Sequence, residues 1–324
     1  MNGLRTVVTL AAALLAAPLA HAQAWPQKPI HLIVPYAAGG AIDSIARTFG
    51  PFFSRDWGQP VLVENRPGAG GHLGAEALAK SAPDGYTLMV TSMGGQAAGP
   101  ALYKKLNYDP VKDVVAVSPV GWSPNILVVN PTLPVTTFND FIALARQGTG
   151  KLNYGSTGVG SGPNLSFEML KAAASVNLEH VPYKGDALLQ LAIVANEVQA
   201  AILTPTSIMT QIKAGKLRAL ATTGKTRWSG LPDLPSIAEG GFPSVVYAPS
   251  VGFLAPGGTP RDIVNRINAE TAKGANDPEM VKTFYPRWGL DPEIMAADAF
   301  HARYISEIET FKKVVRDAKI PQID

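Results

Sequence analysis

The part of this sequence best suited to chemistry is a glycine-containing loop. The apolar run Ile30–Val34 precedes it, and a helical pattern follows it. The loop residues are Tyr36, Ala37, Ala38, Gly39 and Gly40. Adjacent glycines let a backbone turn tightly and approach a ligand, and the free N–H groups of a first helical turn attract negative charge. We therefore predict that this loop binds an anion.

A second loop of similar chemistry lies near the middle of the chain. It follows the short expected strand 153–155 and leads into a helix that begins at Asn164. Its polar and glycine residues are Ser156, Thr157, Gly158, Gly160 and Ser161. A carboxylate could accept hydrogen bonds from its backbone amides and hydroxyls, each worth about 1.5–3 kcal/mol. The alternative is a plain glycine-rich turn with Asn164 as the helix N-cap.

The motifs of nucleotide-binding, serine hydrolase and metal sites are absent from the sequence. Gly39 and Gly40 do not have the spacing of a dinucleotide-binding loop, and no Gly-Lys-Ser/Thr follows them. Neither Ser156 nor Ser161 has the glycine two residues before it that a nucleophile elbow requires. The histidines show no metal-ligand spacing, and the chain has no cysteine. We expect no catalytic residue, no cofactor and no metal.

The N-terminus carries an export signal. Arg5 precedes the apolar run 7–17, and Ala20-His21-Ala22 has the small-x-small pattern of a cleavage site. We expect residues 1–22 to be a signal peptide cleaved after Ala22, which places the mature protein in the periplasm. A buried N-terminal helix is the alternative. Loss of Arg5 lowers the formal charge from +3 to +2, without a basic stripe for nucleic acid. No other segment is suited to direct membrane insertion.

The elements that must position these loops alternate between strand and helix. The first unit has expected strands at 30–34, 61–64 and 87–91 and helices at 43–53 and 74–80. The second has strands at 126–129, 153–155, 178–181, 200–203 and 217–221, with helices at 137–146, 164–174, 187–195 and 206–214. A strand at 251–254 and helices from 259 or 260 to 273 and at 296–318 complete the pattern. This order predicts an α/β fold of two units, each a mainly parallel sheet flanked by helices.

The boundaries between the units follow from a Pro- and Gly-rich segment at 231–260. We expect the chain to cross to the second unit near 122–125 and to return near 247–250. Domain 1 would comprise residues 23–124 and 249–324, and domain 2 residues 125–248. Two crossing segments make a hinge, and a ligand would bind between the domains, at the carboxyl ends of their strands.

These residues together resemble one family. The resemblance rests on Val34-Pro35-Tyr36 with Gly39, Gly40 and Asp43, and on the motifs at 63–71, 83–88, 158–160, 181–185, 214–220 and 255–260. In this order they resemble the Bug, or TctC, family of extracytoplasmic solute-binding proteins of tripartite tricarboxylate transporters. The resemblance covers essentially the whole mature chain.

The resemblance implies a two-domain periplasmic-binding-protein fold of the Venus-flytrap type, whose two loops grip a carboxylate, partly through ordered water. Asp43 would hold the first loop or the start of its helix, while Ser92 and Thr204 would line the cleft. Tyr183, just after an expected strand, is also placed at the cleft. The full expected ligand-binding set is Tyr36, Ala37, Ala38, Gly39, Gly40, Asp43, Ser92, Ser156, Thr157, Gly158, Gly160, Ser161, Asn164, Tyr183 and Thr204.

The chain departs from the usual family pattern at Asn164, Thr204 and Asp186. Neither loop contains Arg or Lys, so N–H dipoles, hydroxyls and water must recognise the charge. Such a site tolerates mono-, di- and tricarboxylates and aromatic acids. We expect a monomeric, non-catalytic protein that delivers its ligand to integral-membrane transporter subunits. The alternatives are a sensory protein that signals to a membrane receptor, and an exported enzyme that acts on a carboxylic acid.

Overall fold

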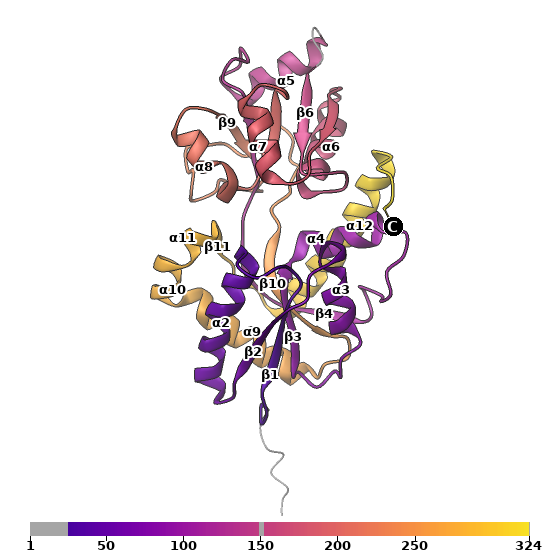
Figure 1. Cartoon of the computed structure of the whole chain (residues 1–324), viewed down its shortest axis with the longest axis vertical. Helices are drawn as coiled ribbons and strands as arrows, with labels where there is room; N and C mark the ends of the chain where they lie inside the picture. Colours follow the sequence, from indigo (N-terminus) through magenta and orange to yellow (C-terminus); the bar gives the residue numbers. More distant parts are fainter. Residues whose placement is uncertain (1–24, 149–151, 324) are drawn as a thin grey trace, which may run out of the picture.

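The computed structural model describes residues 25–148 and 152–323, so the expected signal peptide lies outside the described residues. The chain forms two lobes, each built around one sheet (Figure 1). The six-stranded sheet has the order β11-β4-β10-β3-β1-β2. Its strands are β1 (Ile30–Val34), β2 (Val61–Asn65), β3 (Thr87–Ser92), β4 (Val114–Trp122), β10 (Ser250–Pro256) and β11 (Asp291–Pro292).

Helices cover both faces of this first sheet. They are α2 (Ala41–Trp57), the short 3-10 helix η1 (Ala69–Gly71), α3 (His72–Ala79), α4 (Met93–Leu102), α9 (Arg261–Asn276), α10 (Pro278–Thr283), α11 (Tyr285–Trp288) and α12 (Ala297–Asp317). One core packs Phe49 and Phe53 of α2 against Phe253 of β10. The other core includes Phe300 and Tyr304 of α12. Both cores consist of buried apolar side chains, whose removal from water stabilises the lobe.

The second sheet has five strands in the order β7-β6-β8-β5-β9. They are β5 (Ile126–Val129), β6 (Asn153–Ser156), β7 (Glu179–Pro182), β8 (Ala200–Leu203) and β9 (Arg218–Thr222). Its helices are α5 (Phe138–Gln147), α6 (Gly162–Ala174), α7 (Asp186–Val194) and α8 (Pro205–Lys213). Apolar cores again lie on both faces of the sheet.

The expected α/β fold of two helix-flanked sheets is confirmed, but both sheets are mixed: two of the five neighbouring strand pairs in the first sheet and two of the four in the second are parallel. In the first sheet β2, β1 and β3 are parallel, whereas β10 is antiparallel to β3 and β4. In the second, β7, β6 and β8 are parallel, and β5 is antiparallel to β8 and β9. Strands β10 and β5, which each follow a crossing segment, run opposite to their neighbours, and the short strand β11 is also antiparallel to β4.

Six elements were absent from the sequence-based expectation, namely η1, α4, β4, α10, α11 and β11, and two of these, β4 and α4, have locally unfavourable sequences. Strand β4 contains Pro119 and Gly121, which are unfavourable in strands, yet it pairs with β10 along its whole length. Helix α4 contains Gly94, Gly95, Gly99 and Pro100, which have poor helix propensity. It is nevertheless helical because packing against α12 and the sheet buries most of its residues. Tertiary packing thus overrides local propensity at both elements.

Two extended segments join the lobes, and Figure 1 shows both running between them. Residues 123–125 join β4 to β5, and the segment that ends at Pro249 leads into β10. Because β10 lies in the middle of the first sheet, the returning chain is anchored on both sides.

Candidate functional site

The loop after β1 is organised by one buried carboxylate. Asp43 is 3% exposed and accepts hydrogen bonds from the Gly39 amide at 2.9 Å and from Arg47 Nε at 3.0 Å. Its other oxygen accepts from Asn65 Nδ2 at 2.9 Å, and Asn65 also donates to the carbonyl of Tyr36 at 3.1 Å. The hydrogen bond from Arg47 is the largest cause that lowers the pKa of Asp43 to about 2. Asp43 therefore holds this loop in shape and is itself directed away from solvent.

The loop itself is open to solvent. Residues 37–40 are exposed. Gly39 has φ +86°, a conformation that favours glycine. Gly40, the N-cap of α2, offers no side-chain acceptor to the first amides of this helix. These amides and the positive end of the helix dipole are available to an anion.

Behind the loop lies a chain of buried polar side chains that sequence reasoning missed. The Tyr36 hydroxyl lies 3.3 Å from Thr91 Oγ1, which accepts from Gln96 Nε2 at 3.3 Å. Tyr108 donates to Gln96 Oε1 at 3.3 Å and lies 2.9 Å from His72 Nδ1. Burial lowers the pKa of His72 to about 4, so this imidazole is neutral at neutral pH. No spacing in the sequence signals this set, because its members come from five separate segments.

The second loop is shaped by its own polar side chains. The Ser156 hydroxyl, which is fully buried, donates to the carbonyl of Gly158 at 2.9 Å and lies 2.6 Å from His180 Nε2. Ser161 donates to the same carbonyl at 2.7 Å and accepts from the Asn164 amide at 3.4 Å. Both serine hydroxyls are thus engaged inside the loop.

Asn164 completes this arrangement from inside the first turn of α6. It is 2% exposed, accepts from the Gly160 amide at 2.9 Å and donates to the Tyr154 hydroxyl at 2.8 Å. Asn164 therefore stabilises the loop from inside by hydrogen bonds, and the N-cap of α6 is Ser161. Thr157 remains the half-buried hydroxyl of this loop that faces a cavity.

That cavity, of about 230 Å³, lies between the lobes. One wall is the second loop, residues 157–162, and the other is formed by the start of α4 and the segment around η1. The members of the second wall include Gly94, Gly95, Gly70 and His72. Its lining consists of glycines, apolar side chains, hydroxyls and neutral His72, without an ionic side chain. Such a cavity recognises charge through dipoles and not through a counter-ion.

Glycine is required where the two lobes touch at this cavity. A Cβ at Gly160 would lie 2.5 Å from Leu102 Cδ2 of α4, and a Cβ at Gly162 would collide with the Tyr247 hydroxyl. The second loop therefore approaches the first lobe as closely as backbone allows.

The structure thus gathers part of the expected set. Thr157, Gly158, Gly160 and Ser161 line the cavity. Tyr36 borders it, since its hydroxyl would lie 3.8 Å from a Cβ at Gly95. Residues 37–40 lie outside its lining.

Six further expected residues also lie outside the lining of this cavity: Asp43, Ser156 and Asn164, which support the two loops as described above, and Ser92, Tyr183 and Thr204. Ser92 is the half-buried N-cap of α4. Tyr183 packs beside Gly155 with the core around α7. The Thr204 hydroxyl lies 3.2 Å from Ser207 Oγ at the start of α8.

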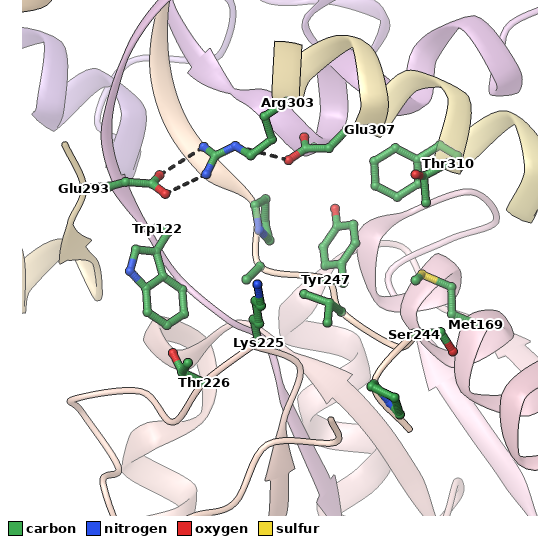
Figure 2. Close-up of a pocket in the computed structure, with 16 residues that line it drawn as sticks. Trp122, Met169, Lys225, Thr226, Ser244, Tyr247, Glu293, Arg303, Glu307 and Thr310 are labelled. Atoms are coloured by element: carbon green, nitrogen blue, oxygen red, sulfur yellow. Dashed lines mark hydrogen bonds and ion pairs between the residues drawn. The ribbon is translucent and has the colours of Figure 1, made fainter. Parts of the chain in front are cut away.

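A second, charged cavity of about 520 Å³ lies on the side of the crossing segments (Figure 2). Arg303 donates to Glu293 through its two terminal guanidinium nitrogens, at 2.6 and 3.0 Å, and to Ser250 Oγ at 2.6 Å. Glu307 lies 3.7 Å from Arg303 Nε. Because Glu293 already neutralises Arg303, burial dominates at Glu307 and raises its pKa to about 7.

This raised pKa predicts a specific pH dependence. Between the unfolded pKa near 4.5 and the folded pKa near 7, the folded chain binds more protons, so its stability falls as the pH rises. Glu307→Gln should remove this slope and make the chain about 1–3 kcal/mol more stable than wild type at pH 8. Urea unfolding between pH 4.5 and 8 measures the difference.

The matched control is Glu309→Gln on the same helix, an exposed carboxylate paired with Lys312. It should leave the pH profile unchanged. Equal slopes in wild type and Glu307→Gln would show that Glu307 titrates normally.

Within 25–148 and 152–323, no group of three or more His, Cys, Asp or Glu residues is placed to hold a metal ion. No helix in the same ranges combines the length and apolar character needed to cross a membrane.

Comparison with known proteins gives a consistent result. Residues 45–319 match the model of the tripartite tricarboxylate transporter family receptor, TctC. Protein BugT of Bordetella pertussis is 33% identical over 311 residues, covering 96% of this chain and 95% of BugT.

Two solved structures with bound carboxylates are similar over nearly their whole length. R. palustris Rpa4515 with adipate is 32% identical, with a TM-score of 0.75, covering 93% of this chain and 100% of that one. MatC (Rpa3494) from Rhodopseudomonas palustris with bound malate is 30% identical, with a TM-score of 0.70, covering 90% of this chain and 100% of that one.

Proposed function

We propose that this chain, which belongs to the TctC family of tripartite tricarboxylate transporter receptors, captures a small carboxylate between its lobes and delivers it to a membrane transporter. The observation that carries the proposal is the cavity of about 230 Å³ shared by both lobes, whose polar groups are amides, hydroxyls and neutral His72. Similar proteins hold adipate and malate, which supports a carboxylate as the ligand class.

In this proposal the exposed loop 36–40 is the first half of the grip and residues 156–161 are the second. Closure would bring the exposed first loop towards the cavity, which adds its amides to those of the second loop. The hinge would consist of the segments near 123–125 and 247–249, with domain 1 formed by 23–124 and 249–324 and domain 2 by 125–248. A ligand drives such closure only through its greater affinity for the closed form.

The proposal also includes export to the periplasm with cleavage after Ala22, and action as a monomeric binding protein without turnover. Delivery requires that membrane transporter subunits recognise the liganded chain. Co-purification of those subunits with the chain in the presence of its ligand would test this step.

Ligand binding is tested by thermal unfolding of the purified mature chain with adipate, malate and benzoate, and with glucose and putrescine as controls. A ligand at 100 times its dissociation constant adds about 2.7 kcal/mol to the free energy of unfolding. At least one of the acids should therefore raise the melting temperature by several degrees. A shift with glucose or putrescine alone would refute the carboxylate proposal.

A further inference from the structure

The charged cavity of about 520 Å³ has walls from both lobes and from the chain that joins them. The first lobe contributes Trp122, at the end of β4, together with Arg303 and Glu307 of α12. The second lobe contributes Met169 of α6 and the segment that follows β9, including Lys225. Any movement of one lobe against the other must change the shape of this cavity.

The two cavities share a wall. Tyr247 and Gly94 line both of them. A Cβ at Gly94 would lie 3.0 Å from the Tyr247 hydroxyl, so the helix start and the ring are in close contact. Tyr247 is also part of the second crossing segment, and it is therefore placed to transmit a change on one side to the other.

Lys225 is the available charge on this cavity wall. Arg303 is occupied by Glu293 and Ser250, and Glu307 faces Arg303 at 3.7 Å. The exposed Lys225 makes no hydrogen bond or ion pair with any residue that the structure describes. Lys225, Trp122 and Tyr247 all line this cavity, and in the view of Figure 2 the Lys225 amine appears between the two rings.

Aromatic walls around one free ammonium define a ligand chemistry. A planar ring can stack on or pack edge-on against indole and phenol faces, and a carboxylate on that ring can pair with Lys225. Cavities of several hundred Å³ with apolar walls and a few polar groups are typical small-molecule sites. Glu307 lies on the opposite wall, on α12 beside Thr310. An anionic group is therefore favoured next to Lys225 and disfavoured next to Glu307.

We propose that the cavity beside the crossing segments is a second ligand site, which takes a small aromatic carboxylate with its ring between Trp122 and Tyr247 and its carboxylate on Lys225. Binding at this site does not depend on the function proposed above. The coupling of this second site to the cleft does rest on that function. Because both lobes form the walls of the second site, a ligand bound there shifts the equilibrium between open and closed forms. By linkage, each ligand changes the affinity of the other site for its ligand by the same factor.

The experiment uses 4-bromobenzoate as the probe and the mature chain as the protein. Crystals soaked in the probe should show bromine anomalous scattering between Trp122 and Tyr247. In solution, calorimetric titration should give a dissociation constant that rises at least tenfold in Lys225→Met. Lys216→Met, which removes another exposed lysine of the second lobe, should bind as wild type does.

A Gly39→Val chain separates the two sites, because it alters only the loop of the cleft. It should retain the Lys225-dependent binding of 4-bromobenzoate even if its cleft is inactive. Bromine found only beside Thr157 and Gly160, or an affinity unchanged in Lys225→Met, would overturn the second site. Bromine between the two rings without Lys225-dependent affinity in solution would mean binding at crystal concentration only, which also overturns it.

Discussion

Gly39→Val is expected to weaken carboxylate binding by about tenfold or more while the unliganded chain stays folded. Gly39 has φ +86°, which costs a β-branched residue about 1–3 kcal/mol. A Cβ at this position has open space around it, so the substitution strains the backbone without a clash. The loop would relax by releasing the Gly39 amide from Asp43, and this moves the amides that we propose hold the ligand. Calorimetric titration with the best acid of the thermal panel measures the loss.

The control for this variant is Gly58→Val at the other end of the same helix. Gly58 has φ +66°, ends α2 as its C-cap and is also surrounded by open space. The backbone strain is therefore similar, but the position lies away from the cleft. Gly58→Val should lose stability and keep its affinity. If both variants lost affinity equally, the effect would be global and residues 36–40 would not belong to the grip.

Asp43→Asn is expected to lower the free energy of unfolding by about 2 kcal/mol at pH 7. The buried carboxylate has its pKa lowered from 3.8 to about 2, so its contribution is present above pH 4 and is lost as the pH falls towards 2. Asparagine has one acceptor oxygen for three donors, so at least one of the Gly39, Arg47 and Asn65 hydrogen bonds is broken. The difference between variant and wild type should therefore shrink between pH 4 and pH 2 in urea unfolding.

Glu64→Gln is the matched control, since it makes the same carboxylate-to-amide change one residue from Asn65. Glu64 forms an exposed two-point pair with Arg66, at 2.8 and 3.1 Å. Exposed pairs contribute about 1 kcal/mol or less. Asp43→Asn should also weaken ligand binding, which Glu64→Gln should not. Equal stability losses in the two variants would contradict the role of Asp43 in holding the loop.

Much of the fold follows from local patterns. The apolar runs at β1, β3, β5 and β8 are buried strands, and the glycine loops after β1 and β6 lead into helices as expected. Strand β4 and helix α4 were not predicted, because Pro119 and the glycines of α4 are unfavourable locally and become acceptable only through pairing and packing. The position of β10 between β3 and β4 likewise depends on pairing between distant segments.

The candidate site shows the same division. Both loops could be found because each is a short stretch whose glycines and hydroxyls are adjacent in the sequence. The buried chain from Tyr36 to His72 could not be found, because hydrogen bonds link residues that are up to 55 positions apart. The sequence also does not show which hydroxyls are already hydrogen-bonded. The Ser156 hydroxyl bonds to the Gly158 carbonyl and to His180, and the folded chain brings His180 to it.

The sequence by itself determined the alternation of strands and helices, the two uncharged glycine loops and the family, since each of these depends on residues close together in the chain. The tertiary structure decided which polar groups remain available. It directs Asp43 towards Asn65 and Arg47, uses Ser161 as a helix cap, and leaves Lys225 free in the cavity that Trp122 and Tyr247 also line. The physical reason is that a polar side chain satisfies its hydrogen bonds with whatever lies nearest in space, and those neighbours exist only once the two sheets and the chain between them are in place.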